Sequence, residues 1–275
     1  MLEQAVQVNV AAALAEDVGY GDVSAALIDP KTIYQATVIT RTDGVFCGAA
    51  WVNETLAQVD GSIRITWEVT DGDVLTPNQV LYRLEGSAQG MLTAERTMLN
   101  FVQLLSGTAT RTATYVRLIE GTNAQLLDTR KTIPGLRIAQ KYAVLCGGGS
   151  NHRLGLFDAY LLKENHIAAA GSIDAAVQRA KSTHPHMQVE VEVESLAELE
   201  QAIAASADVA MIDNFSLKET ERAVALAQGK LKLEASGGID ANSITDIARQ
   251  GVDYISIGDL TKTVTPLDLS MRFQD

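Results

Sequence analysis

The sequence predicts an α/β protein made of an incomplete α/β barrel of about six strands and an N-terminal α+β sandwich domain. Three observations favour this fold class. After residue 122, short apolar runs alternate with helix-length segments, which is typical of a parallel sheet. These strand and helix units number six, fewer than the eight of a complete barrel. Between residues 35 and 85 the pattern has the period of two that is typical of strands. A doubly wound open sheet is the alternative for the second half.

Composition limits the classes of function. The chain has 275 residues, 47% hydrophobic and 20% charged, which is ordinary for a globular protein with a sizeable core. Its net charge of -12 disfavours binding to nucleic acid or to an anionic membrane surface. The N-terminus has no basic leader and no apolar stretch is long enough to span a membrane, so we expect a cytoplasmic protein. Cys47 and Cys146 form no C-x-x-C pair, which gives no support to a disulfide framework or a zinc site.

The patterns in residues 1–110 predict the N-terminal α+β domain. Leu2, Val6, Val10 and Leu14 recur every four residues, as in an amphipathic helix. Strands are expected within residues 36–48 and 62–86, with a helix at 49–59 between them. Residues 92–116 predict a long helix with one apolar face, from which Arg96 projects. Taken alone, Arg96 is typical of a surface or ion-paired arginine.

The barrel domain is expected over residues 111–266. Its candidate strands are residues 124–128, 159–163, 188–193, 209–213, 232–237 and 253–258. Because active sites of α/β barrels form at the carboxyl ends of the strands, the candidate site residues follow directly from these ends. They are Arg130, Lys131, Lys163, Glu192, Glu194, Asp213, Asn214, Ser236 to Gly238, Gly258 and Asp259.

One strand carries three glutamates at alternating positions. The period of two places Glu190, Glu192 and Glu194 on one face and three valines on the other. If the valines pack against the helices, the glutamates point into the barrel, where a carboxylate requires a partner. Lys163 on a neighbouring strand is the natural one. A purely structural ion network is the alternative interpretation.

Positive charge is concentrated in residues 128–166. This stretch has six Lys and Arg against three acids, whereas the rest of the chain has 16 against 31. It also contains His152, His166 and three consecutive glycines at 147–149, where the backbone can approach a ligand closely. A small, highly anionic ligand explains this concentration. A solvated basic face is the alternative.

Two glycine-containing strand ends indicate a phosphate site. Backbone N–H groups of the turn Ser236 to Gly238, aided by the helix that follows, can hold a phosphate, and Gly258 ends the next strand. Neither a P-loop nor a G-x-G-x-x-G motif is present. Asp259 follows Gly258 and would repel a phosphate, so we expect its side chain to face the surface.

Three motifs resemble those of the nicotinate-nucleotide pyrophosphorylase family, also called quinolinate phosphoribosyltransferases. They are DTRKT-x-PGLR, KYAV-x-CGGG-x-NHR and LLKENH, and the resemblance extends from EDVGYGDVS to LDLSMRF, almost the whole chain. It implies an incomplete α/β barrel and a C-terminal tail, residues 267–275, that packs on the N-terminal domain. The implied reaction is transfer of phosphoribosyl from phosphoribosyl pyrophosphate to quinolinate, with Mg²⁺ and decarboxylation, in NAD biosynthesis. The implied partners are these two substrates and a second copy of the chain, in a homodimer or a higher oligomer. The small residue that the family usually has after the phosphate glycine is replaced here by Asp259.

The resemblance also implies a role for each matching residue. Quinolinate would be bound by Arg96 from the neighbouring subunit, together with Arg130, His152, Arg153 and Lys163. Phosphoribosyl pyrophosphate would be held by Lys131, Lys163, Ser236, Gly237, Gly238 and Gly258, with Glu192 and Asp213 on ribose hydroxyls or Mg²⁺. The catalytic set would be Lys131, Lys163, Glu192 and Asp213.

Two other functions remain open. One is a paralogous enzyme that acts on a different anion, such as the related molybdenum-utilisation protein. The other is a non-catalytic binder of phosphorylated anions, and the acids Glu192 and Asp213 argue against it because a simple anion binder gains nothing from them.

Overall fold

The computed structural model describes residues 1–274, which form two compact units. The first contains residues 1–113, 132–148 and the C-terminal segment from residue 260; the second contains residues 114–131 and 149–259. The sequence-based boundary at residue 110 puts residues 132–148 in the barrel domain, whereas in the structure they pack with the first unit. None of the helices in the described residues combines the length and apolar character that a membrane span requires.

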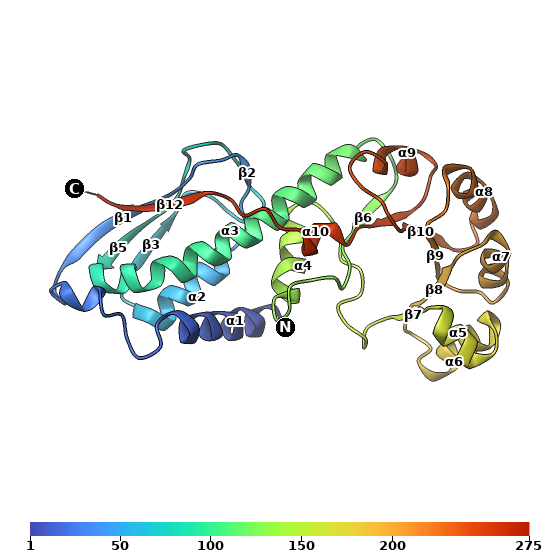
Figure 1. Ribbon diagram of the computed structural model, residues 1–275, viewed down its shortest axis with the longest axis horizontal. Helices are drawn as coiled ribbons and strands as arrows, with labels where there is room; N and C mark the ends of the chain where they lie inside the picture. The colour runs from blue at the N-terminus through green and yellow to red at the C-terminus, as the bar shows by residue number, and fades with distance from the viewer. Residues whose placement is uncertain (275) are drawn as a thin grey trace. The chain divides into compact units, whose positions relative to one another are not determined.

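The first unit is built on an antiparallel sheet with strand order β12-β1-β5-β3 (Figure 1). The strands of this sheet are β1 (Ile33–Thr40), β3 (Arg64–Trp67), β5 (Val80–Ser87) and β12 (Leu269–Phe273), and β2 (Gly44–Val45) pairs with β4 (Val74–Leu75) in a separate two-stranded sheet. Its helices are α1 (Leu2–Asp17), the 3-10 turn η1 (Ala25–Leu27), α2 (Ala49–Asp60), most of α3 (Ala88–Leu118), α4 (Arg137–Cys146) and most of α10 (Asp259–Lys262). Pairing of β12 with β1 places residues 269–273 in this sheet. The C-terminal tail therefore packs on the N-terminal domain, as expected from the sequence.

Apolar side chains hold this unit together in layers. Sheet residues such as Val38 and Leu84 pack against Met98 and other residues of α2 and α3. On the other side of these two helices a second cluster joins α1 and α4, through residues such as Val10 and Ala143. Packing of α4 in this second cluster explains why residues 132–148 belong to the first unit.

The second unit is a six-stranded parallel sheet with order β6-β11-β10-β9-β8-β7. Its strands are β6 (Gln125–Leu127), β7 (Tyr160–Leu162), β8 (Val189–Val193), β9 (Val209–Asp213), β10 (Lys232–Ser236) and β11 (Tyr254–Ser256). Its helices are α5 (Glu164–Ala170), α6 (Ile173–Thr183), α7 (Leu196–Ala204), α8 (Leu217–Ala227) and α9 (Ile244–Arg249), and α5 to α8 lie along one side of the strands (Figure 1). All six predicted strands are present, and the incomplete six-stranded barrel is confirmed.

Serines begin three of these helices immediately after a strand or a short turn. Ser195 accepts a hydrogen bond from the backbone N–H of Glu198 at the start of α7, and Ser216 forms a capping box with Glu219 at the start of α8. Ser172 caps α6 in the same way. These caps satisfy N–H groups that lack partners within the helix, so the turns that follow β8 and β9 are well defined. Side chains at the strand ends are therefore held on ordered backbone.

Candidate active site

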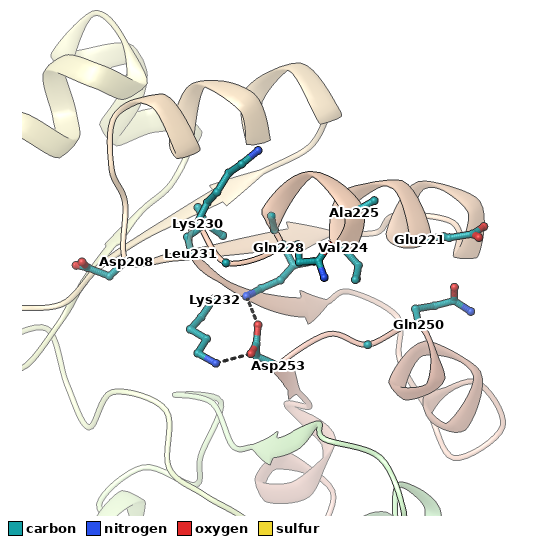
Figure 2. Close-up of a pocket in the computed structure, with 14 residues that line it drawn as sticks. Asp208, Glu221, Val224, Ala225, Gln228, Lys230, Leu231, Lys232, Gln250 and Asp253 are labelled. Carbon is teal, nitrogen blue, oxygen red and sulfur yellow. Dashed lines mark hydrogen bonds and ion pairs between the residues drawn. The ribbon is translucent and has the colours of Figure 1, made fainter.

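The candidate site lies at the carboxyl ends of the barrel strands. The hollow drawn in Figure 2 lies at the opposite ends, where residues such as Asp208, Lys232 and Asp253 stand at or just before the starts of strands. Sites in α/β barrels form at the carboxyl ends, and the charged residues predicted from the sequence are also there. The carboxyl ends of the strands are therefore the candidate active site.

Two arginines come together beyond the end of β6. The buried Asp128 accepts hydrogen bonds from the backbone N–H of His152 (2.9 Å) and from the Asn151 side chain (2.7 Å), which ties the loop to the strand. Partial burial lowers the pKa of Arg153, and the nearby charge of Arg130 lowers it further. The buried Nε of Arg130 has no hydrogen-bond partner among the described residues. Adjacent guanidinium groups of this kind favour an anionic ligand, because it supplies both the missing acceptor and the opposite charge.

His152 is held by bonds within the protein. Its Nδ1 accepts a hydrogen bond from the Arg153 backbone N–H (2.8 Å), so the ring carries its proton on Nε2. That Nε2 lies 2.9 Å from Glu190 and 3.5 Å from Glu234. Both nitrogens have protein partners, so direct contact with a ligand through this ring requires the exchange of one of these bonds.

Glu190 and Glu234 form a buried acidic pair around this histidine. Their side chains are 5% and 2% exposed, and one oxygen of each has no hydrogen-bond partner among the described residues. Burial raises the pKa of Glu190 to about 7. Burial, followed by repulsion from Glu190, raises the pKa of Glu234 to about 8. The pair therefore retains protons near neutral pH, which reduces the cost of burying two carboxyl groups.

The glutamates of β8 become more exposed toward its carboxyl end. Glu190 is buried, Glu192 is partly exposed and Glu194 is exposed, whereas the three valines between and before them are fully buried. The Lys163 ammonium donates a hydrogen bond to Glu192 from the neighbouring strand end, as the alternation predicts. Because 45% of the Lys163 side chain is exposed, a ligand can reach this pair.

The ends of β9 and β10 bring Asp213 against the Ser236 to Gly238 turn. The N–H of Asn214 donates to the Ser236 carbonyl (3.0 Å), and the Asn214 side chain donates to Asp213 (2.8 Å). A Cβ on Gly237, which has φ of 91°, would lie 2.7 Å from the Asp213 carboxylate. Glycine is therefore required both for the backbone conformation and for this close approach.

The helix that follows this turn, α9, begins only at Ile244, and the Ser243 side chain does not cap it. In the turn before the helix, Asp240 accepts hydrogen bonds from the N–H groups of Asn242 and Ser243. A contribution of α9 to phosphate binding stays a prediction.

The side chain of Lys131 covers the backbone just beyond the end of β11. A Cβ on Gly258 would come within 2.8 Å of Lys131 Cδ, so the lysine side chain crosses directly above this glycine. Asp259 is half-buried and begins α10, where the positive end of the helix dipole favours an acid.

Arg96 belongs to the first unit and is exposed on α3. The remaining predicted site residues belong to the second unit: Arg130, Lys131, His152, Arg153, Lys163, Glu192, Asp213, Ser236, Gly237, Gly238 and Gly258. The sequence did not single out Asp128, which ties the loop to the strand end, or Glu234, which contacts His152. A signal for Asp128 was present, because it follows an apolar strand.

Comparison with known proteins identifies the family. Residues 22–106 match the N-terminal domain and residues 108–272 the C-terminal domain of quinolinate phosphoribosyl transferase. A probable nicotinate-nucleotide pyrophosphorylase (carboxylating) of Bacillus subtilis is 42% identical over 93% of this chain and 89% of its own length. The corresponding protein of Mycobacterium leprae is 41% identical over 94% of each chain. The solved structure of the nicotinate-nucleotide pyrophosphorylase from Francisella tularensis is 50% identical, with a TM-score of 0.95 over 99% of this chain and 97% of that one. The chain therefore belongs to the quinolinate phosphoribosyl transferase family.

Proposed function

We propose that this protein transfers phosphoribosyl from phosphoribosyl pyrophosphate to quinolinate and releases carbon dioxide and pyrophosphate, giving nicotinate mononucleotide for NAD biosynthesis. The observation that carries the proposal is the juxtaposition of Arg130 and Arg153 at the barrel's carboxyl end, in a chain of this family. Quinolinate has two adjacent carboxylates, and two guanidinium groups can bind them with paired, charge-assisted hydrogen bonds. The relatives' names state the same activity for those proteins.

Phosphoribosyl pyrophosphate would occupy the neighbouring strand ends. Lys131 lies over Gly258, where one lysine can offset phosphate charge while the backbone approaches closely. The positive-φ turn at Gly237 and Gly238 offers backbone N–H groups to the 5′-phosphate. Asp213, next to this turn, is placed to accept hydrogen bonds from ribose hydroxyls.

Mg²⁺ fits this arrangement only when part of its coordination comes from elsewhere. The described residues contain no group of three metal-binding side chains that includes Glu192 or Asp213. Mg²⁺ commonly takes one or two carboxylates and completes its shell with water and phosphate oxygens, so these two acids are suitable ligands beside a pyrophosphate. The ion would neutralise charge on the departing pyrophosphate.

The chemistry would rely on position and charge. Departure of pyrophosphate leaves a positively charged ribose carbon that the pyridine nitrogen attacks, and no covalent intermediate with the protein is needed. Lys163, held by Glu192, can offset the negative charge of the pyrophosphate or of the quinolinate carboxylates. Lys163 and His152 are the candidates for protonating the ring carbon after decarboxylation.

We also propose that the active unit is a homodimer in which Arg96 completes the partner's site. Arg96 is exposed on α3 in a different unit from the other candidate residues, so it is available to another copy of the chain. A two-fold dimer would use the same surface twice and complete two equivalent sites.

The test is to incubate the purified protein with quinolinate, phosphoribosyl pyrophosphate and Mg²⁺ and to measure carbon dioxide. We expect release with quinolinate and none with nicotinate. Binding gives a second measurement, because a ligand specific to the native state raises the melting temperature. Quinolinate should do so and nicotinate should not. Absence of carbon dioxide release with quinolinate, together with transfer to nicotinate, would assign the protein to a different phosphoribosyl acceptor.

A further inference from the structure

The two cysteines of the chain lie together in the first unit, although 98 residues separate them in the sequence. Their sulfur atoms and a carboxylate oxygen of Asp71 all lie within 4.8 Å of one another. Neither sulfur belongs to the site described above, and the sequence contains no local spacing that would pair these residues. Their proximity is a consequence of the fold alone.

Packing fixes the backbone of Cys47. Its N–H donates to the Ser106 hydroxyl (2.9 Å), and the same hydroxyl donates back to the Cys47 carbonyl (3.1 Å). The following residue, Gly48, has φ of 131°, and a Cβ there would meet Val102 of α3 at 3.3 Å. Cys47 is therefore held against α3 and is fully buried.

The position of Cys146 is fixed in a similar way. It is the last residue of α4, and the next residue, Gly147, is pressed against α3 so closely that a Cβ would lie 2.3 Å from the Ala109 carbonyl oxygen. Cys146 differs from Cys47 in being partly exposed. Cys146 is therefore the more accessible of the two cysteines to an oxidant from solvent.

The surroundings make Cys146 the more reactive of the two. A hydrogen bond from the Cys47 thiol lowers the pKa of the Cys146 thiol. Burial, together with donation of that hydrogen bond, raises the pKa of Cys47. Thiolates are the nucleophiles in thiol oxidation, so the less buried member of the pair is also the activated one.

A metal ion is the competing occupant of this cluster. Asp71 is already satisfied, because one oxygen accepts from the N–H groups of Gly48 (2.8 Å) and Ala49 (3.1 Å) and the other from the Tyr142 hydroxyl (2.7 Å). Metal coordination by this carboxylate would compete with bonds that cap α2. Because the two sulfurs have no available third metal ligand among the described residues, the cluster favours a disulfide over a bound metal ion.

We propose that Cys47 and Cys146 form a reversible intramolecular disulfide when a hydroperoxide oxidises Cys146. The Cys146 thiolate attacks the peroxide oxygen, which forms a sulfenic acid and releases the reduced fragment of the peroxide as water or alcohol. The Cys47 thiol then attacks the sulfenic sulfur, which forms the S–S bond and releases water. Rotation of the two side chains must bring the sulfurs to about 2.05 Å, and a dithiol reverses the reaction.

The experiment treats the reduced full-length protein with hydrogen peroxide and counts thiols after denaturation. We expect loss of both thiols, a cross-link between the two cysteine-containing peptides on a non-reducing map, and recovery of both thiols with dithiothreitol. None of these measurements depends on the proposed enzymatic activity.

Matched variants separate the two steps. Cys47→Ser should be oxidised only at Cys146, which a dimedone adduct would detect as sulfenic acid. Cys146→Ser should keep its remaining thiol, because Cys47 is fully buried. Circular dichroism checks that each variant is folded. The thiol count and the cross-link in the wild-type protein test the proposal even if a variant does not fold.

Two results would overturn the proposal. One is a wild-type protein whose Cys146 goes to sulfinic acid, or stays reduced, without a cross-link at peroxide concentrations that oxidise glutathione. The other is a stoichiometric metal in the purified protein that is absent from Cys47→Ser, which would assign the cluster to a metal site.

Discussion

The two ends of the barrel strands contain similar residues in very different arrangements. At the amino ends, Asp208 accepts from Lys181 (3.2 Å) and from the backbone N–H of Val189 (2.8 Å). Asp253 accepts in the same way from Lys232 (2.7 Å) and from the N–H of Leu233 (2.9 Å), as Figure 2 shows for the lysine. Each acid therefore pairs with one lysine and fixes the start of one strand. These charges are accounted for by the structure of the barrel itself.

At the carboxyl ends Lys163 pairs with Glu192, but other charged groups are not balanced in this way. Arg130 has a buried Nε without a partner among the described residues, and partial burial, together with the charge of Arg130, lowers the pKa of Arg153. Glu190 and Glu234 are buried beside each other and retain protons near neutral pH. Such arrangements destabilise a protein unless a ligand or a function compensates for them. The comparison indicates that unbalanced charge, more than the number of charges, distinguishes the site from a structural ion network.

The largest effect should come from removing a cation at the carboxyl ends. We expect Arg130→Ala and Lys163→Ala each to lower kcat/KM by a factor on the order of 10² to 10³ or more, as for loss of a charge-stabilising group in an active site. The fold should be unchanged, because both side chains are partly exposed. Initial rates measure kcat/KM, and circular dichroism shows whether the fold is unchanged. If the residual folded fraction of either variant retained full activity, that residue would be structural and the contrast between the two ends would fail.

Arg96 tests whether one chain contains the whole site. Arg96→Ala and Lys163→Ala should each be inactive alone. When they are refolded together in equal amounts, about half of the dimers are mixed, and one site in each mixed dimer has neither defect, so roughly a quarter of all sites should regain activity. The measurement is the specific activity of the mixture relative to wild type. No recovery on mixing would mean that Arg96 serves its own subunit.

The sequence predicts strands better than loops in this chain. Apolar runs such as residues 209–213 alternate with helices, and the parallel arrangement then places Lys163, Glu192 and Asp213 at one edge. Loop 149–159 has no such periodicity, so the bonds from Asp128 that position His152 could not be predicted. The proximity of Cys47 to Cys146 was equally hidden, because it depends on how α3 and α4 pack. Periodic patterns predict which edge carries the site, whereas contacts between distant residues require the fold.

The buried acids predict a dependence of stability on pH. The folded state raises the pKa of Glu234 from 4.5 to about 8, so between these values it binds a proton more tightly than the unfolded state. The stabilisation is complete below the unfolded pKa and is lost as the pH rises through the folded pKa. Over this window the group lowers the free energy of unfolding by at most about 1.4 kcal/mol per pH unit.

Glu234→Gln isolates this contribution, because glutamine is neutral at every pH and has nearly the same shape. Urea unfolding at several values between pH 5 and pH 8 should show a weaker decrease in stability for the variant than for wild type. Equal pH dependence in the two proteins would mean that Glu234 does not hold the proton.

The smallest effect is expected at the amino ends, where the charges are balanced. The Lys232 side chain is 60% exposed, and its partner Asp253 is 31% exposed. Exposed ion pairs of this kind contribute little to stability, so Lys232→Met should change the free energy of unfolding only slightly and should leave kcat/KM unchanged. Asp253→Ala should cost more than Lys232→Met, because it also removes the acceptor for the N–H of Leu233. Urea unfolding of both variants measures the free energy of unfolding, and initial rates measure kcat/KM. A loss of activity in Lys232→Met comparable to that in Lys163→Ala would show that the amino ends also bind a ligand, and unbalanced charge would then no longer distinguish the two ends of the barrel.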